Sequence, residues 1–214
     1  MSTPGRRLVL WRHGQTSWNA VGRAQGHHDV GLDPTGHAQA AAAAPALAAL
    51  QPVAVWCSDL SRARQTCDYL ERLTGLSAKV DQRLREYDVG ARQGMTTAEF
   101  AAAFPSAHAA WADGEDMPRV PGAEGAGEVA ARIVPVLSEV VGSLAAGETA
   151  VAVTHGAALK VALVELLGWP RSQARDLAGV DNCGWVTVTD VAGGSAHRPR
   201  LRLAGYNQTA AVRG

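Results

Sequence analysis

Arginine and histidine residues follow three short apolar runs of this sequence, at the point where each run ends. The clusters are Arg12-His13-Gly14 after residues 8–11, residues 58–62 with Arg62 after residues 53–57, and His155-Gly156 after residues 149–154. Runs of this length and composition predict buried strands. The carboxyl ends of parallel strands meet at one edge of an open α/β sheet, where ligands bind. We therefore expect two arginines, two histidines and several helix N-termini to converge there, and such a cluster favours a multiply charged anion such as phosphate.

The segments between these runs carry helix signals. Asp33 and Pro34 suit the N-cap and first position of a helix through the alanine-rich segment to residue 50. Gly75 suits the end of a helix that follows residue 59. Further helices are predicted at 128–144 and 157–167, and further strands at 78–80, 184–190 and 199–203. This alternation predicts an α/β fold, a three-layer α/β/α sandwich with a mostly parallel central sheet.

The segment from about residue 91 to residue 128 has a weaker pattern. It contains short helical pieces at 96–104 and 106–112, followed by several prolines and glycines. We interpret this segment as a small helical excursion that covers the active site. A length of 214 residues fits a single domain over residues 1–214 that includes this excursion.

The composition indicates a globular protein. Twenty basic and twenty acidic side chains leave no net charge, which argues against nucleic acid or an anionic membrane as the main partner. The three widely spaced cysteines make a poor disulfide framework, and they lack the pairing of a zinc site. No apolar stretch reaches the roughly 18 residues of a membrane span. The cytoplasm is the expected location.

The order and spacing of the motifs resemble those of the histidine phosphatase superfamily, also called phosphoglycerate-mutase-like. The first motif is Arg12-His13-Gly14, with Gln15-Thr16 and Asn19 after it. The similarity continues through Gln25-Gly26, residues 32–36, residues 58–63 with Gln65-Thr66, residues 84–86 and residues 154–156. A single motif of this kind is a weak match, whereas the first motif and five further ones in register over most of the chain are specific.

The resemblance implies a set of catalytic residues. His13 would be the nucleophile that becomes phosphorylated, and Glu86 would protonate the leaving oxygen. Arg12, Arg62 and His155 would hold the phosphoryl oxygens. The resemblance also implies a small phosphorylated substrate, no cofactor or metal, and a homodimer at the level of the family.

The resemblance extends to substrate binding. Asn19 would add a polar contact to the phosphoryl group, while Gln25 and Gly26 would line the mouth of the pocket. Gly156 is assigned to the same substrate-binding group. Whether His27 or His28 contacts the substrate is left open by the sequence.

Elementary chemistry agrees with these roles. Nearby cations disfavour the imidazolium form, so Arg12 and Arg62 would keep His13 neutral and able to attack. Phosphoryl transfer requires mainly positioning and charge stabilisation. Glu86 can give a proton in the first step and take one from water in the second.

The choice between phosphatase and phosphoglycerate mutase rests on the excursion. A mutase requires extra cations above the phosphoryl site for a bisphosphorylated, carboxylated intermediate. Between residues 87 and 150 the basic residues are Arg92, Arg119 and Arg132, against nine acidic residues. We therefore favour a phosphatase, although Arg23 or Lys160 could compensate.

Two segments bear on the substrate. Residues 14–19 and 84–94 are similar to those of actinobacterial enzymes that act on glucosyl-3-phosphoglycerate, and to those of broad acid phosphatases. An α-ribazole-phosphate phosphatase and a protein phosphatase are further alternatives. A non-catalytic phosphate- or phosphoprotein-binding module is the alternative of another class, and it would need neither His13 nor Glu86.

Overall fold

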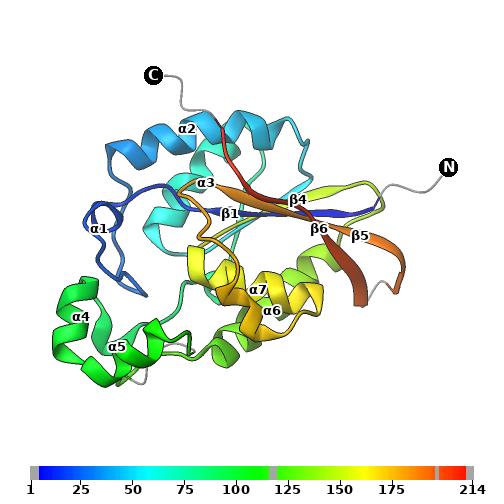
Figure 1. The fold of residues 1–214 in the computed structure, drawn as a ribbon. Helices are drawn as coiled ribbons and strands as arrows, with labels where there is room; N and C mark the ends of the chain where they lie inside the picture. The colour runs from blue at the N-terminus through cyan, green and yellow to red at the C-terminus, as the bar shows by residue number, and fades with distance from the viewer. Residues whose placement is uncertain (1–4, 116–119, 196–197, 211–214) are drawn as a thin grey trace.

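The computed structural model describes residues 5–115, 120–195 and 198–210. Its centre is a six-stranded sheet with the order β3-β2-β4-β1-β5-β6 (Figure 1). The strands are β1 (Arg7–Arg12), β2 (Ala54–Cys57), β3 (Lys79–Val80), β4 (Thr149–Thr154), β5 (Trp185–Ser195) and β6 (Arg198–Gln208). The first four are parallel to one another, while β5 pairs antiparallel with β1, and β6 pairs antiparallel with β5. The mostly parallel sheet predicted from the sequence is thus confirmed.

The register of the sheet brings the carboxyl ends of β1, β2 and β4 to the same level. Arg12 at the end of β1 pairs with Thr154 at the end of β4, and Cys57 at the end of β2 pairs with Val153. The next backbone groups continue the ladder, since His13 N donates to Thr154 O at 3.1 Å and Ser58 N donates to Val153 O at 3.0 Å. His13, Ser58 and His155 therefore leave the sheet side by side.

Helices cover both faces of the sheet, which makes three layers (Figure 1). One face carries α2 (Pro34–Ala48) and α3 (Ser61–Thr74), and the other carries α6 (Ala126–Gly142) and α7 (Gly156–Leu167). Strand β1 alternates between the two, with Val9 and Trp11 in one apolar cluster and Leu8 and Leu10 in the other. A parallel sheet buried on both faces has this nearly continuous apolar sequence.

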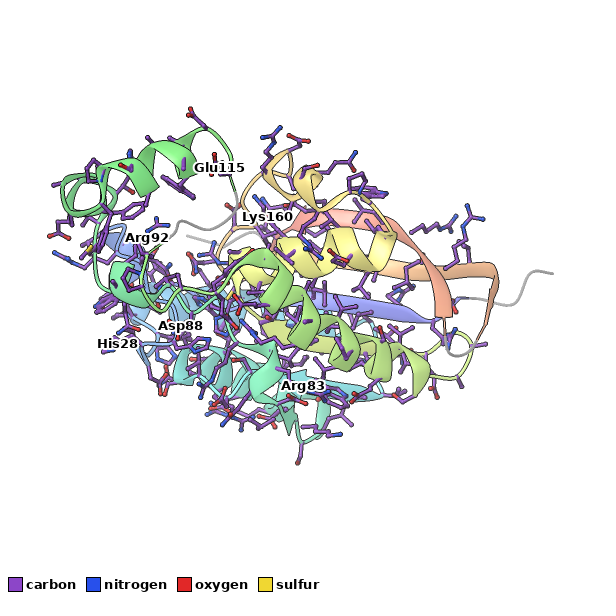
Figure 2. The ribbon with its side chains drawn as sticks, turned by 90° about the horizontal axis from the view of Figure 1, so that it is seen from below. His28, Arg83, Asp88, Arg92, Glu115 and Lys160 are labelled. Carbon is purple, nitrogen blue, oxygen red and sulfur yellow. The ribbon has the colours of Figure 1, made fainter. Side chains whose placement is uncertain are left out.

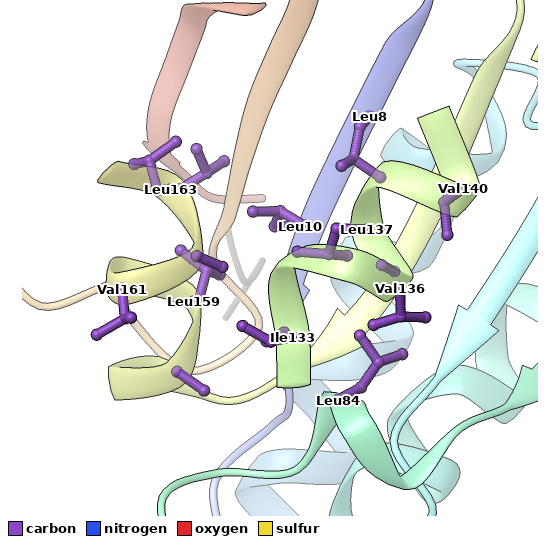
Figure 3. Packing of buried hydrophobic residues seen from close by; sticks show 14 of the residues in the cluster. Leu8, Leu10, Leu84, Ile133, Val136, Leu137, Val140, Leu159, Val161 and Leu163 are labelled. Atoms are coloured by element: carbon purple, nitrogen blue, oxygen red, sulfur yellow. The ribbon is translucent and has the colours of Figure 1, made fainter. Parts of the chain in front are cut away.

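Figure 3 shows the α6 and α7 side of this core. Leu8 and Leu10 of β1 lie against Ile133 of α6 and Leu159 of α7, and all four side chains are at most 1% exposed. This packing fixes the start of α7 relative to the end of β1, which is where the candidate site lies.

The predicted helix ends are confirmed at two positions. Asp33 caps α2, because its carboxylate accepts a hydrogen bond of 2.8 Å from Gly36 N. Gly75 follows α3 in the left-handed conformation and donates to Glu71 O at 2.8 Å. Both ends agree with the general preferences for these positions.

The excursion contains α4 (Thr97–Ala103) and α5 (Pro105–Ala112), which Figure 1 shows beside the main body. Arg92 holds it together, because its guanidinium carbon lies 4.7 Å from the Phe100 ring centre and 4.8 Å from that of Trp111. The 3-10 helices η1 (Gln82–Leu84) and η2 (Gly90–Arg92) precede it.

Three local features differ from the sequence prediction or were not part of it. Residues 17–20 form a short helix, α1 (Ser17–Ala20), because Thr16 and Asn19 make a reciprocal capping box. A further 3-10 helix, η3 (Arg171–Arg175), follows α7. The closing strands β5 and β6 are longer than predicted, because their backbone pairing continues through a segment of low β-propensity to Ser195 and Arg198. In the described part of the chain, no helix is long and apolar enough to cross a membrane.

Candidate active site

His13 lies directly after β1 and is 3% exposed. Its carbonyl oxygen accepts hydrogen bonds from Cys183 N at 3.2 Å and from Asn182 Nδ2 at 3.1 Å. Its ring Nδ1 lies 2.7 Å from Gly14 O. Because a carbonyl oxygen can only accept, Nδ1 carries the proton and Nε2 keeps its lone pair. The ring is thus held in the tautomer that a nucleophilic Nε2 requires.

The surroundings of His13 favour its neutral form. Burial, then the charge of Arg62, then the charge of Arg12 lower the pKa of His13 well below its usual value of 6.5. Near pH 7 the ring is therefore uncharged, because burial and the two nearby cations all disfavour the imidazolium form.

His155 follows β4 and is fully buried. Arg62 Nε donates to His155 Nδ1 at 3.2 Å, so the proton of the neutral ring is on Nε2, which lies 2.9 Å from Ser58 Oγ. Burial, then Arg62, then His13 lower the pKa of His155 well below 6.5. The rings of His155 and His13 lie 5.1 Å apart. A phosphoryl oxygen that binds His155 Nε2 must share or replace Ser58.

Arg62 lies in the first turn of α3 with 0% exposure. Its Nη1 donates to His28 O at 2.9 Å and its Nη2 donates to Gly26 O at 2.7 Å. With the bond to His155, three of the five N–H groups of the guanidinium are used, which leaves two for a ligand. Burial lowers the pKa of Arg62 to about 10, so it is charged near pH 7.

Gly26 serves this arginine through its backbone. Its φ is +54°, and a β-carbon there would lie 2.6 Å from Val89 Cγ2. The position therefore requires glycine, and the structure gives Gly26 the role of holding Arg62 through its carbonyl oxygen.

Arg12 approaches the site from the end of β1. Its Nη1 donates to Val180 O at 2.5 Å, whereas its buried Nε has no hydrogen-bond partner in the described structure. A β-carbon at Gly156 would lie 3.2 Å from this Nε, so the glycine lets the guanidinium and the start of α7 come close. Burial lowers the pKa of Arg12. An unpartnered guanidinium nitrogen beside a helix N-terminus is suited to an anion.

Glu86 is bound to the N-terminus of α7. Its carboxylate accepts from Ala158 N at 2.8 Å, from Ala157 N at 3.0 Å and from Tyr87 N at 3.0 Å. Helix N-termini stabilise negative charge, and all three bonds are made to carboxylate oxygens. Glu86 lies beside Arg12 and Gly156, and all three line the same cavity.

The segment that carries Glu86 is held from behind by Arg132 of α6. This guanidinium donates to three backbone oxygens, those of Arg83 (3.0 Å), Arg85 (2.7 Å) and Glu86 (2.7 Å). It also pairs with both carboxylate oxygens of Glu124 at 2.8 Å. No role for Arg132 was predicted from the sequence. The feature that could have pointed to one is the position of this arginine in the middle of a largely apolar helix.

The two histidines left open by the sequence do not line the cavity. His27 Nε2 lies 2.8 Å from Glu86 O and donates to it, which adds a second contact behind the Glu86 segment. His28 is exposed and stacks on Trp18 with ring centres 4.6 Å apart. The structure thus gives His27 a supporting position for Glu86.

Asn19 and Gln25 lie near the site, and each side-chain amide has a hydrogen-bonding group without a partner in the described structure. Asn19 Oδ1 accepts from Thr16 N at 3.1 Å and from Asn182 Nδ2 at 3.4 Å. Gln25 is 9% exposed, and its buried Oε1 has no partner in the described structure. Like His13, Arg62 and His155, neither side chain is among the residues that line the cavity beside Arg12 and Glu86.

A cavity of about 640 Å³ opens outward from Arg12 and Glu86. Its walls come from α7, from η3 and from the end of the excursion, where Trp111 and Glu115 contribute. Figure 2 labels Lys160 of α7 and Glu115, which follows α5, and both residues line this cavity. The volume exceeds what a phosphate group alone would fill, so a larger substrate fits. Within the described ranges, no group of three or more His, Cys, Asp or Glu side chains could hold a metal ion.

Fold and site together define an α/β protein with a neutral histidine and two arginines at the carboxyl edge of a parallel sheet. A model of the histidine phosphatase superfamily (branch 1) matches residues 8–199. The chain belongs to the histidine phosphatase superfamily. It is an enzyme of the phosphatase class, as the sequence predicts.

Three members of this family illustrate which proteins the chain is similar to. Glucosyl-3-phosphoglycerate phosphatase of Mycolicibacterium vanbaalenii is 39% identical over 219 residues, which cover 97% of this chain and 96% of that protein. A solved structure of the mycobacterial glucosyl-3-phosphoglycerate phosphatase with VO3 is 37% identical and has a TM-score of 0.86, covering 95% of this chain and all of that one. A probable phosphoglycerate mutase of Erwinia tasmaniensis is 33% identical over 177 residues, covering 83% of this chain and 81% of that protein.

Proposed function

We propose that this enzyme hydrolyses a small phosphomonoester through a phosphohistidine at His13, and that its substrate is glucosyl-3-phosphoglycerate or a close analogue. The observation that carries the proposal is the free Nε2 of a buried, neutral His13 between Arg12 and Arg62. The similarity to glucosyl-3-phosphoglycerate phosphatases supports the choice of substrate.

In the first step, the lone pair of His13 Nε2 forms a bond to phosphorus while the bond between phosphorus and the leaving oxygen breaks. Protonated Glu86 gives its proton to that oxygen, and the two unused N–H groups of Arg62 together with Arg12 Nε stabilise the charge on the phosphoryl oxygens. Asn19 and His155 add polar contacts. For this step Glu86 must release at least one of its backbone N–H donors.

In the second step, water attacks phosphorus and the N–P bond breaks, which returns the electron pair to His13. Glu86 accepts the proton of the water. The hydrogen bonds from Ala157 N and Ala158 N hold the carboxylate of Glu86 at the start of α7, where it can serve as this acceptor.

The described part of the excursion favours hydrolysis over mutase chemistry. Trp111, Gly114, Glu115 and Ala126 are its contributions to the cavity wall, and none of them is a cation. Among the described residues, the cations that line the cavity beyond Arg12 are Lys160, Arg171 and Arg175, which come from α7 and η3. Assembly into a homodimer and location in the cytoplasm stay predictions from the sequence.

Steady-state phosphate release from a panel of esters tests the substrate. We expect glucosyl-3-phosphoglycerate to give the highest kcat/KM, ahead of sugar phosphates, α-ribazole phosphate and phosphopeptides. Faster conversion of 3-phosphoglycerate to its isomer with added 2,3-bisphosphoglycerate would favour the mutase alternative. Binding of esters without any turnover would favour the non-catalytic module.

A further inference from the structure

We propose that Lys160 forms a second anion subsite in the outer part of the cavity, and that it binds a carboxylate a few bonds away from the phosphate ester. The substrate class is therefore a phosphorylated hydroxy acid. This inference rests on the proposed function, since it concerns the part of the substrate that is not hydrolysed.

The position of Lys160 follows from helix α7. Gly156, at the start of this helix, lies against Arg12 at the inner end of the cavity, and Lys160 is one turn further along. Four residues of α-helix rise about 6 Å, and positions four apart share one face. Lys160, Gly156 and Arg12 all line the same cavity. A three-carbon acid can span such a separation with its phosphate at Arg12.

The charge of Lys160 is unmatched. In the described part of the chain, no carboxylate oxygen lies within 4.0 Å of Nζ, and its recorded hydrogen bond goes to the carbonyl oxygen of Leu177 at 2.9 Å. Lys160 is half-buried, and this burial lowers its pKa. A partly desolvated ammonium with unused N–H donors gains from an incoming anion.

Neighbouring cations are less suited to this task. Arg171 and Arg175 also line the cavity, but both are exposed at its rim. Arg171 already pairs with Glu165 at 2.6 Å, and Arg175 lies 3.8 Å from Asp176. They add positive potential at the entrance of the cavity. Lys160 lies inside the cavity and has no carboxylate partner in the described structure.

A matched pair of substrates isolates the carboxylate. 3-Phosphoglycerate and glycerol 3-phosphate differ in having a carboxylate or a hydroxymethyl group at the same position. We expect the parent enzyme to prefer 3-phosphoglycerate, and Lys160→Met to lower the ratio of the two kcat/KM values about tenfold. Lys160→Arg keeps a cation and should keep most of this ratio.

The chain offers a clean control, because its sequence contains one other lysine, Lys79. Lys79 lies on the edge strand β3 over the Trp56 ring, so Lys79→Met should leave the ratio unchanged. A loss that is equal for both substrates in Lys160→Met would indicate a general disturbance of the 169–180 segment and would overturn the inference. So would a parent enzyme with no preference between the two esters.

Binding separates this inference from the proposed function. Calorimetric titration of 3-phosphoglycerate into His13→Ala needs no turnover. Adding Lys160→Met should raise its Kd about tenfold and leave the Kd of inorganic phosphate within twofold. If the parent hydrolyses no ester of the panel, glucosyl-3-phosphoglycerate included, but this difference in Kd is found, the proposed function fails and the subsite stands. If the Kd values for 3-phosphoglycerate are equal, the subsite is wrong whatever the enzyme hydrolyses.

Discussion

The protonation of two histidine rings decides what the centre can do. Gly14 O fixes the proton of His13 on Nδ1, and Arg62 fixes that of His155 on Nε2. Arg62 thus acts on both rings, directly through a hydrogen bond and at a distance through its charge. The position of the Arg12 guanidinium depends instead on Gly156, which has no β-carbon to occupy the space beside it.

Gly156→Ala tests the placement of Arg12. Its β-carbon would lie 3.2 Å from Arg12 Nε, and the guanidinium must move by a few tenths of an ångström. We expect kcat/KM to fall about tenfold, because small displacements of groups that stabilise charge are costly. The melting temperature should not fall, since alanine favours the helix. Gly179→Ala is the control, because a β-carbon there meets nothing within 4 Å. Equal kcat/KM values for the parent and Gly156→Ala would contradict the assignment of Arg12.

Helix α6 positions Glu86 through the side chain of Arg132. Arg132 itself does not line the cavity. Arg132 donates hydrogen bonds to the carbonyl oxygens of the segment from Arg83 to Glu86. It also pairs with Glu124, near the end of the excursion. Glu124 also accepts from Asp88 N at 2.8 Å. The segment that carries Glu86 is therefore fixed between α6 and the start of α7.

Arg132→Met should disturb proton transfer through Glu86. General acid catalysis matters most for a poor leaving group, and it contributes about 10²–10⁴-fold. We expect kcat/KM for an alkyl phosphate to fall at least about tenfold more than for p-nitrophenyl phosphate, whose leaving group needs little protonation. The ratio for the two esters is the measurement. Arg83→Met is the control, because Arg83 also pairs with two acids, Asp81 and Glu139, at an exposed position. An equal loss for both esters would show that Arg132 serves only the fold.

The elements that could be predicted from the sequence are those with a strong local pattern. Strands β1, β2 and β4 are apolar throughout, and Asp33 and Gly75 are typical helix ends. Helix α1 was missed because a Thr-Asn capping box is a weak signal in four residues. The roles of Arg132 and Lys160 depend on which backbone oxygens and which cavity lie beside α6 and α7, and no local pattern contains that information.

At the scale of the whole molecule, the three-layer sandwich buries two titratable rings at one sheet edge. His13 and His155 are at most 3% exposed, and both have a pKa well below 6.5. In the unfolded chain each ring titrates near its usual value. Below that value the unfolded state binds protons that the folded state does not, so folding stability falls as the pH falls.

Urea unfolding measures this linkage. Each of the two histidines should lower the free energy of unfolding by about 1 kcal/mol between about pH 7 and about pH 5.5. His13→Asn should reduce the pH dependence by about this amount, whereas His28→Asn, at an exposed position, should change it little. An identical pH dependence in the parent and His13→Asn would contradict a buried, neutral His13.

Rapid-quench trapping of the phosphoenzyme is the most direct test of the central claim, that His13 is the nucleophile. With a substrate that carries a labelled phosphoryl group, the parent should acquire label within the first turnover, and the label should be lost in acid and survive alkali. His13→Ala should acquire none and should turn over at least about 10³-fold more slowly. An acid-stable label, or hydrolysis by His13→Ala at the parent rate, would contradict the mechanism.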